Sequence, residues 1–218
     1  MTAKAVAIAQ QKGGAGKTTI AIQLGVTWAR QGQRVALLDI DPQGSLAAWY
    51  DLRRKAVEDG RLVAHEVQGW KLATEIDRLK SNFDVLIIDT PPHAETDARV
   101  AIRAASLILV PVQPSPMDLW ATTPTLTLAK REKSSSLLVL NRLPSRGRLV
   151  DVIRSRIAEE QLPLAKTALG NRSAFAASMM EGKGVVETQP KGTAAVEIRA
   201  LAEEVGAVIG LAARRAAE

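Results

Sequence analysis

Two lysines stand five positions apart, Lys12 and Lys17, in a glycine-rich stretch at 10–20 that reads Gln-Gln-Lys-Gly-Gly-Ala-Gly-Lys-Thr-Thr-Ile and directly follows an apolar run. A loop of this kind wraps phosphates with backbone N–H groups, adds one lysine for the β- and γ-phosphates, and places a Ser or Thr hydroxyl on Mg²⁺. Gly16, Lys17 and Thr18 fill those places. The motif therefore predicts a phosphate-binding loop with one lysine more than it needs.

The loop departs from the usual spacing. Its first glycine would fall at position 11, where the chain has Gln11, and the glycines instead follow Lys12. We expect Lys17 to reach the β- and γ-phosphates and Thr18 to ligate Mg²⁺. The predicted phosphate-binding residues are Gly13, Gly14, Ala15, Gly16, Lys17, Thr18 and Thr19.

Carboxylates follow two apolar runs. Asp39 and Asp41 come at the end of 35–39, and alternation along a strand sends both to the same side. One is suited to hold Mg²⁺ through water and the other to orient an attacking water, although a simple turn that caps the next helix is the alternative. Asp89 ends the run 85–89 and is our candidate for a further Mg²⁺-binding carboxylate.

Asparagine closes another apolar run, at Asn141-Arg142. The GTP-binding signature Asn-Lys-x-Asp is absent, and an asparagine amide can pair with the donor and acceptor edge of adenine. The pattern favours ATP over GTP and predicts Asn141 and Arg142 as nucleotide-binding residues. A turn residue that closes a strand is the alternative.

Short β-branched runs alternate with helical spacing along the chain. The predicted strands are 6–9, 35–39, 85–89, 107–112 and 137–140. The predicted helices are 18–30, 98–105, 119–131, 150–160 and 194–211. This alternation predicts an α/β fold, a mostly parallel twisted sheet covered by helices on both faces, in a single domain over 1–218.

Composition limits the compartment and the metal chemistry. The chain has 218 residues, 46% of them hydrophobic, and no cysteine, which excludes disulfides and thiolate metal sites. No run approaches the roughly eighteen uninterrupted apolar residues of a membrane-spanning helix, and no leader precedes the first strand. We expect a cytoplasmic protein. Of the four tryptophans, Trp28 lies within an apolar helical pattern and is expected in the core.

The net charge of +6 is concentrated in one window, 130–172, which holds ten basic and four acidic residues. The basic residues there are Lys130, Arg131, Lys133, Arg142, Arg146, Arg148, Arg154, Arg156, Lys166 and Arg172. A localised basic field favours a polyanionic partner, with nucleic acid as the first candidate, while a solvated basic face is the alternative.

The three motifs, Lys12 to Thr19, Asp39-Ile-Asp41-Pro-Gln-Gly and Asp89-Thr-Pro-Pro, occur in the order found in ParA-type partition ATPases of the deviant Walker A class, and the chain resembles that family. Later segments at 110–119, 172–175 and 181–186 resemble the short, ParF-like members that lack an N-terminal helix-turn-helix. The resemblance spans essentially the whole chain.

The resemblance implies a P-loop ATPase that forms a homodimer with ATP and Mg²⁺. It implies that Lys12 acts in trans on the phosphates of the second subunit, much as an arginine finger does. Asp41 matches the hydrolysis aspartate of the family. Asp39 then becomes the partner of Asp89 and Thr18 at the Mg²⁺ site.

The resemblance also implies non-specific DNA binding by the ATP dimer and stimulation by a small ParB-like or other activating protein, in plasmid or chromosome partition or cargo positioning on the nucleoid. Sequence-independent binding requires clustered basic side chains. The candidates are Arg142, Arg146, Arg148, Arg172 and Lys183.

Two alternatives remain open from the sequence. One is a MinD-like membrane-cycling ATPase, although the tail 207–218 has few large apolar residues and makes a weak anchor at best. The other is a carboxylate-activating enzyme of the same fold, similar to dethiobiotin synthetase or cobyrinate amidase. The cargo, the activating partner, the plasmid or chromosomal origin and the rate of hydrolysis are left open.

Overall fold

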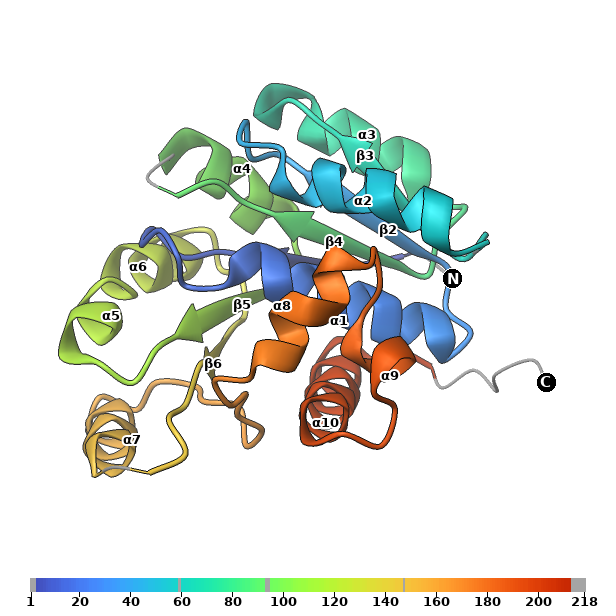
Figure 1. Cartoon of the computed structure of the whole chain (residues 1–218). Helices are drawn as coiled ribbons and strands as arrows, with labels where there is room; N and C mark the ends of the chain where they lie inside the picture. Colours follow the sequence, from blue (N-terminus) through green and yellow to red (C-terminus); the bar gives the residue numbers. More distant parts are fainter. Residues whose placement is uncertain (1–2, 59, 93–94, 147, 213–218) are drawn as a thin grey trace.

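The computed structural model describes residues 3–58, 60–92, 95–146 and 148–212. Within these ranges six strands form one parallel sheet in the order β3-β2-β4-β1-β5-β6 (Figure 1). The strands are β1 (Lys4–Ile8), β2 (Val35–Asp39), β3 (Leu62–Glu66), β4 (Val85–Asp89), β5 (Leu107–Val112) and β6 (Ser136–Leu140). The predicted fold class is confirmed.

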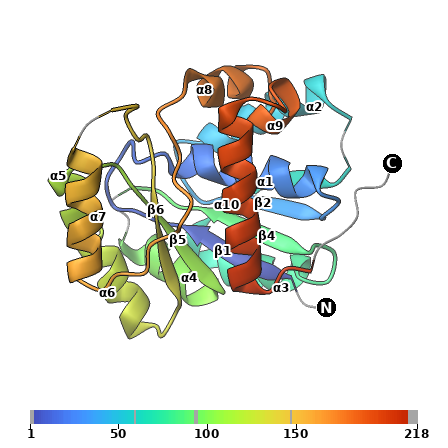
Figure 2. The ribbon, with the colours of Figure 1, turned by 90° about the horizontal axis from the view of Figure 1, so that it is seen from below.

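Helices connect the strands and cover both faces of the sheet, as Figures 1 and 2 show from two directions. The helices are α1 (Lys17–Arg30), α2 (Ser45–Ala56), the 3-10 turn η1 (Gly69–Lys71), α3 (Leu72–Leu79), α4 (Glu95–Ala104), α5 (Pro116–Trp120), α6 (Thr123–Arg131), α7 (Leu149–Glu159), α8 (Ser173–Met180), α9 (Val185–Thr188) and α10 (Thr193–Ile209). Helices α1 and α8 to α10 pack on one face, and α3, α4, α6 and α7 pack on the other.

The strands are apolar because both of their faces are buried. In β1, Val6 and Ile8 lie in the cluster that contains α1 and α10, whereas Ala5 and Ala7 lie in the cluster that contains α3 and α4. Trp28 of α1 is buried in the first cluster, as the sequence predicts, and its indole N–H donates to the Ala202 carbonyl.

The predicted elements differ from the structure at several places, and helices α2, α3, α8 and α9 were not predicted. The prediction of one helix over 119–131 is wrong, because α5 ends at Trp120 and α6 begins at Thr123. Pro124 lies in the first turn of α6, where a missing N–H costs nothing, whereas inside a continuous helix it would break the hydrogen-bond ladder. Strand β3 was not predicted, since it ends in polar residues and is only partly buried.

Across the part of the chain that the structure describes, we find no helix with the length and apolar character needed to cross a membrane. Residues 213–218, the end of the tail 207–218 that was considered as a membrane anchor, lie outside the described residues.

Candidate nucleotide site

The predicted phosphate-binding loop lies at the carboxyl edge of the sheet. It joins β1, in the middle of the sheet, to α1, which begins at Lys17. Ile8 is in register with Asp89, and Asp89 is in register with Asp39. The strand order therefore brings the loop and both predicted acidic strand ends together at the place where parallel sheets bind ligands.

Glycines give the loop its shape. Gly14 and Gly16 have φ values of 74° and 93°, which side chains rarely allow. A Cβ atom on Gly16 would also lie 2.4 Å from the Nδ2 atom of Asn141. Glycine is thus required at position 16 both by the backbone angle and by the neighbouring asparagine.

Asn141, at the end of β6, holds the loop from outside. Its amide nitrogen donates to the Ala15 carbonyl at 2.8 Å, and its amide oxygen accepts from the backbone N–H of Arg142 at 2.9 Å. Arg142 has a φ of 54°, an unusual angle for a residue other than glycine. The sequence favours pairing of Asn141 with adenine over a simple turn role; in the structure Asn141 positions the loop, and pairing with adenine stays a prediction.

A cavity of about 680 Å³ opens beside Gly16, Thr19, Asn141 and Arg142, and the segment 170–179 forms its other wall. A volume of this size suits a small cofactor or nucleoside. Phe175 and its neighbours in this wall were not among the predicted nucleotide-binding residues. The resemblance of the segment 172–175 to ParF-like proteins was the signal that could have identified them.

Lys17 is almost fully buried, with 6% of its surface exposed. Burial lowers the pKa of its ammonium group, and the nearby carboxylates of Asp89 and Asp41 oppose that shift. A buried lysine next to an open loop of N–H groups provides a positive charge that phosphate oxygens would satisfy.

Asp89 is buried, and neither of its carboxylate oxygens has a hydrogen-bond partner among the residues described. The pKa of Asp89 is raised to about 7, mainly by burial and also by the charge of Asp39, while the neighbouring Thr18 hydroxyl and Lys17 oppose the shift. Two unpartnered carboxylate oxygens near a threonine hydroxyl fit the oxygen ligands that Mg²⁺ prefers. In the described ranges we find no group of three or more acidic, histidine or cysteine residues that could hold a metal ion.

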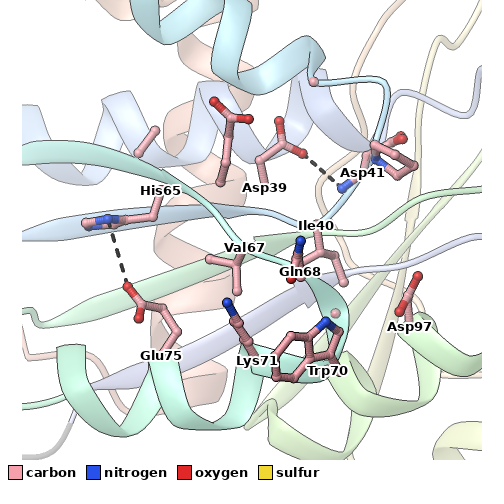
Figure 3. A pocket seen from close by; sticks show the side chains of 15 residues that line it. Asp39, Ile40, Asp41, His65, Val67, Gln68, Trp70, Lys71, Glu75 and Asp97 are labelled. Atoms are coloured by element: carbon pink, nitrogen blue, oxygen red, sulfur yellow. Dashed lines mark hydrogen bonds and ion pairs between the residues drawn. The ribbon is translucent and has the colours of Figure 1, made fainter.

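Asp39 and Asp41 take different local roles. One oxygen of Asp39 accepts the backbone N–H of Asp41 at 3.1 Å (Figure 3). Its other oxygen accepts the backbone N–H of Ala47, in the first turn of α2, at 3.1 Å. Burial raises the pKa of Asp39, and these two hydrogen bonds oppose the shift. Among the described residues the carboxylate of Asp41 accepts only the N–H of Gln43, at 3.0 Å. Asp39, not Asp41, therefore caps the helix, and Asp41 keeps an oxygen for other chemistry.

Lys12 does not lie free in solution. Its ammonium group is 2.5 Å from an oxygen of Asp118 on α5, and its side chain is 39% exposed whereas that of Asp118 is 3% exposed. Ser115, the N-cap of α5, donates its hydroxyl to the same oxygen at 2.5 Å. Lys12, the additional lysine of the loop, is thus paired with an aspartate of its own chain.

The candidate DNA-binding residues fall into two groups. Arg142, Arg146 and Arg148 are exposed in the segment between β6 and α7. Arg172 pairs with Glu197 at 2.5 Å and Lys183 pairs with Glu181 at 3.2 Å, so their charges are partly neutralised. The first group is the stronger candidate for contacts with a polyanion.

Comparison with known proteins gives the same assignment. Residues 6–206 match the CobQ/CobB/MinD/ParA nucleotide binding domain. The chain is 32% identical over 212 residues to the maintenance of carboxysome distribution protein A of Halothiobacillus neapolitanus, covering 92% of this chain and 95% of that protein.

Solved structures share the fold. The ATP complex of a McdA variant from Cyanothece has a TM-score of 0.79 at 19% identity and covers 97% of this chain and 98% of that one. MinD of Pyrococcus horikoshii with Mg-ADP has a TM-score of 0.79 at 20% identity, covering 95% and 98%. With its glycine loop, buried lysine and acidic strand ends in place, the chain belongs to the ParA/MinD family of P-loop nucleotide-binding proteins.

Proposed function

We propose that this protein is an ATPase that switches between a monomer and an ATP-bound homodimer in order to position a cargo. The observation that carries the proposal is the placement of Lys12, the additional lysine of the loop. Lys17 already supplies the charge that a phosphate loop needs, whereas Lys12 is paired with Asp118 and partly exposed. A lysine in that position is available to the phosphates of a second subunit once the pair with Asp118 opens.

The residues of the chain divide the chemistry between them. The loop N–H groups and Lys17 bind the phosphates, and Lys12 of the second subunit stabilises the charge that develops during phosphoryl transfer. One carboxylate oxygen of Asp41 accepts the N–H of Gln43, and its other oxygen orients the attacking water. Mg²⁺, held by Thr18 and Asp89 with Asp39 nearby, would neutralise phosphate charge.

The dimer is proposed to bind DNA without sequence preference and to release it after hydrolysis. Arg142, Arg146 and Arg148 support this role because they are exposed and lie within seven residues of one another along the chain. A nucleoid-associated, cytoplasmic protein with a small ParB-like or other activating partner follows from the same proposal. The cargo is a plasmid, a chromosome region or a protein assembly, and the similarity to a carboxysome distribution protein favours the protein assembly.

Three variants test the switch by light scattering with ATP and Mg²⁺. Lys17→Ala should abolish tight ATP binding, and Lys12→Ala should keep ATP binding but lose ATP-dependent dimerisation. Asp41→Ala should accumulate the ATP dimer because hydrolysis stops. A Lys12→Ala protein that dimerises like the wild type would exclude the role in trans.

DNA binding is tested separately by titration at several salt concentrations. Binding should require ATP and weaken steeply with salt. Arg146→Ala and Arg148→Ala should each reduce the salt slope by about 1. The matched control is Lys55→Ala, since Lys55 is exposed at the end of α2. Nucleotide-dependent binding to anionic vesicles instead of DNA would favour the MinD-like alternative.

A further inference from the structure

Strand β3 forms one edge of the sheet, and part of its outer side is open. Backbone groups alternate direction along a strand. The N–H of Val67 donates to Asp39, and the carbonyl of Arg61 accepts from Val35, so the odd-numbered residues of this segment face β2. Leu62, Ala64 and Glu66 therefore face outward.

The outward groups differ in their partners. The Leu62 carbonyl accepts from the Tyr50 hydroxyl at 3.5 Å. Within the described ranges no neighbouring strand pairs with Ala64 or Glu66 on that side. By contrast, the outer side of β6 pairs with Leu164 by an isolated bridge. An unpaired strand edge is a template for one more strand.

A groove of about 900 Å³ surrounds the carboxyl end of β3 (Figure 3). It is acidic: the charged residues that line it include five carboxylates and a single lysine, Lys71, among the described residues. The carboxylates are Asp39, Asp41, Glu66, Glu75 and Asp97. Side chains from both faces of β3 contribute, because Glu66 is in register with Asp39 whereas His65 lies 4.0 Å from Glu75 on α3.

Trp70 forms the exposed aromatic part of this groove. Its surface is 75% exposed, which is high for a large apolar side chain. The ammonium group of Lys71 lies 4.7 Å from the centre of its ring, so the ring already binds a cation at this place. Aromatic faces of this kind bind arginine well.

We propose that β3 and this groove bind an extended basic segment of a partner protein as an added strand. Main-chain hydrogen bonds to Ala64 and Glu66 fix the position and register of the added strand along β3. Its cationic side chains face the carboxylates on both sides of β3, and one arginine stacks on Trp70. Because Asp41 lines the same groove, the docked segment lies next to the residue proposed to orient water. Docking itself does not depend on the ATP switch.

The test uses a short acetylated peptide that alternates arginine and valine, titrated into the ADP-bound protein by calorimetry. We expect saturable binding, and no binding of the same peptide with glutamate in place of arginine. N-methylation of alternate backbone nitrogens should abolish binding in one register and spare it in the other. Amide hydrogen exchange should show new protection at Ala64 and Glu66.

Variants of the protein locate the site. Glu66→Lys should weaken the peptide about tenfold, and Trp70→Ala about threefold. Ala64→Pro removes an outward N–H without touching the ladder to β2, and proline is tolerated on edge strands, so it should reduce binding while the protein stays folded. The matched control is Glu203→Lys, an exposed position on α10.

The outcomes separate this proposal from the proposed function. Lys12→Ala should bind the peptide as the wild type does, even where it fails to dimerise. Binding that ignores N-methylation, or that Glu203→Lys weakens as much as Glu66→Lys, would show non-specific charge attraction and overturn strand addition. Absence of binding at low salt would overturn the proposal and leave the ATP switch untouched.

Discussion

Asp118→Asn is the most direct test of how Lys12 is controlled. The replacement has the same shape and keeps an oxygen that can accept from Ser115, but it removes the negative charge that holds the Lys12 ammonium group at 2.5 Å. If each subunit must open this pair to place Lys12 on the other subunit, the pair opposes dimerisation. Its removal should therefore favour the ATP dimer.

The size of the effect follows from the exposure of the two side chains. Asp118 is 3% exposed but Lys12 is 39% exposed, so the pair is worth about 1 kcal/mol, near the upper end for surface pairs. A dimer opens two such pairs, which gives about 2 kcal/mol. The dissociation constant of the dimer should fall about thirtyfold.

The assay is sedimentation equilibrium with ATP and Mg²⁺ in the Asp41→Ala background, where hydrolysis does not deplete the dimer. Ser115→Ala is the control, because it removes the other hydrogen bond to Asp118 and leaves the Lys12 pair in place. It should not tighten the dimer. If Asp118→Asn in this background dimerises no more tightly than Asp41→Ala alone, while its Tm and its affinity for ADP are unchanged, the Lys12 pair does not oppose dimerisation.

Three further predictions concern the rest of the molecule. Arg53→Met leaves buried Glu187 without its main partner and should lower the free energy of unfolding by about 3 kcal/mol in denaturant titrations, whereas Arg54→Met, on an exposed pair, should cost less than about 0.5 kcal/mol. Asn141→Ala should weaken ADP about tenfold in calorimetry, because it removes a buried hydrogen bond to the phosphate loop worth about 1.4 kcal/mol. The raised pKa of Asp89, about 7, means that the unfolded chain loses this proton first, so the nucleotide-free protein should lose stability between about pH 4 and pH 7. Asp89→Asn should flatten that part of the pH profile and raise Tm at pH 8; an unchanged profile would contradict the assignment.

The phosphate loop and the acidic strand ends could be predicted from the sequence because each is a continuous segment whose chemistry is local. A strand followed by glycines, a lysine and threonines specifies its own turn and helix start. The same holds for the buried strands, which are apolar over their whole length because both faces are covered. The weaker signal of β3 was missed because an edge strand is only partly buried.

The tertiary structure alone decided which distant residues serve the loop. Asn141 supports Ala15 across 126 positions, and Lys12 meets Asp118 across 106, because the strand order places the ends of β5 and β6 beside β1. No local pattern records that order. The sequence by itself thus determined that the chain has the groups to bind a nucleotide. Only the folded sheet decided that Asn141 positions the loop, that Lys12 pairs with Asp118, and that an acidic groove lies beside the open edge of β3.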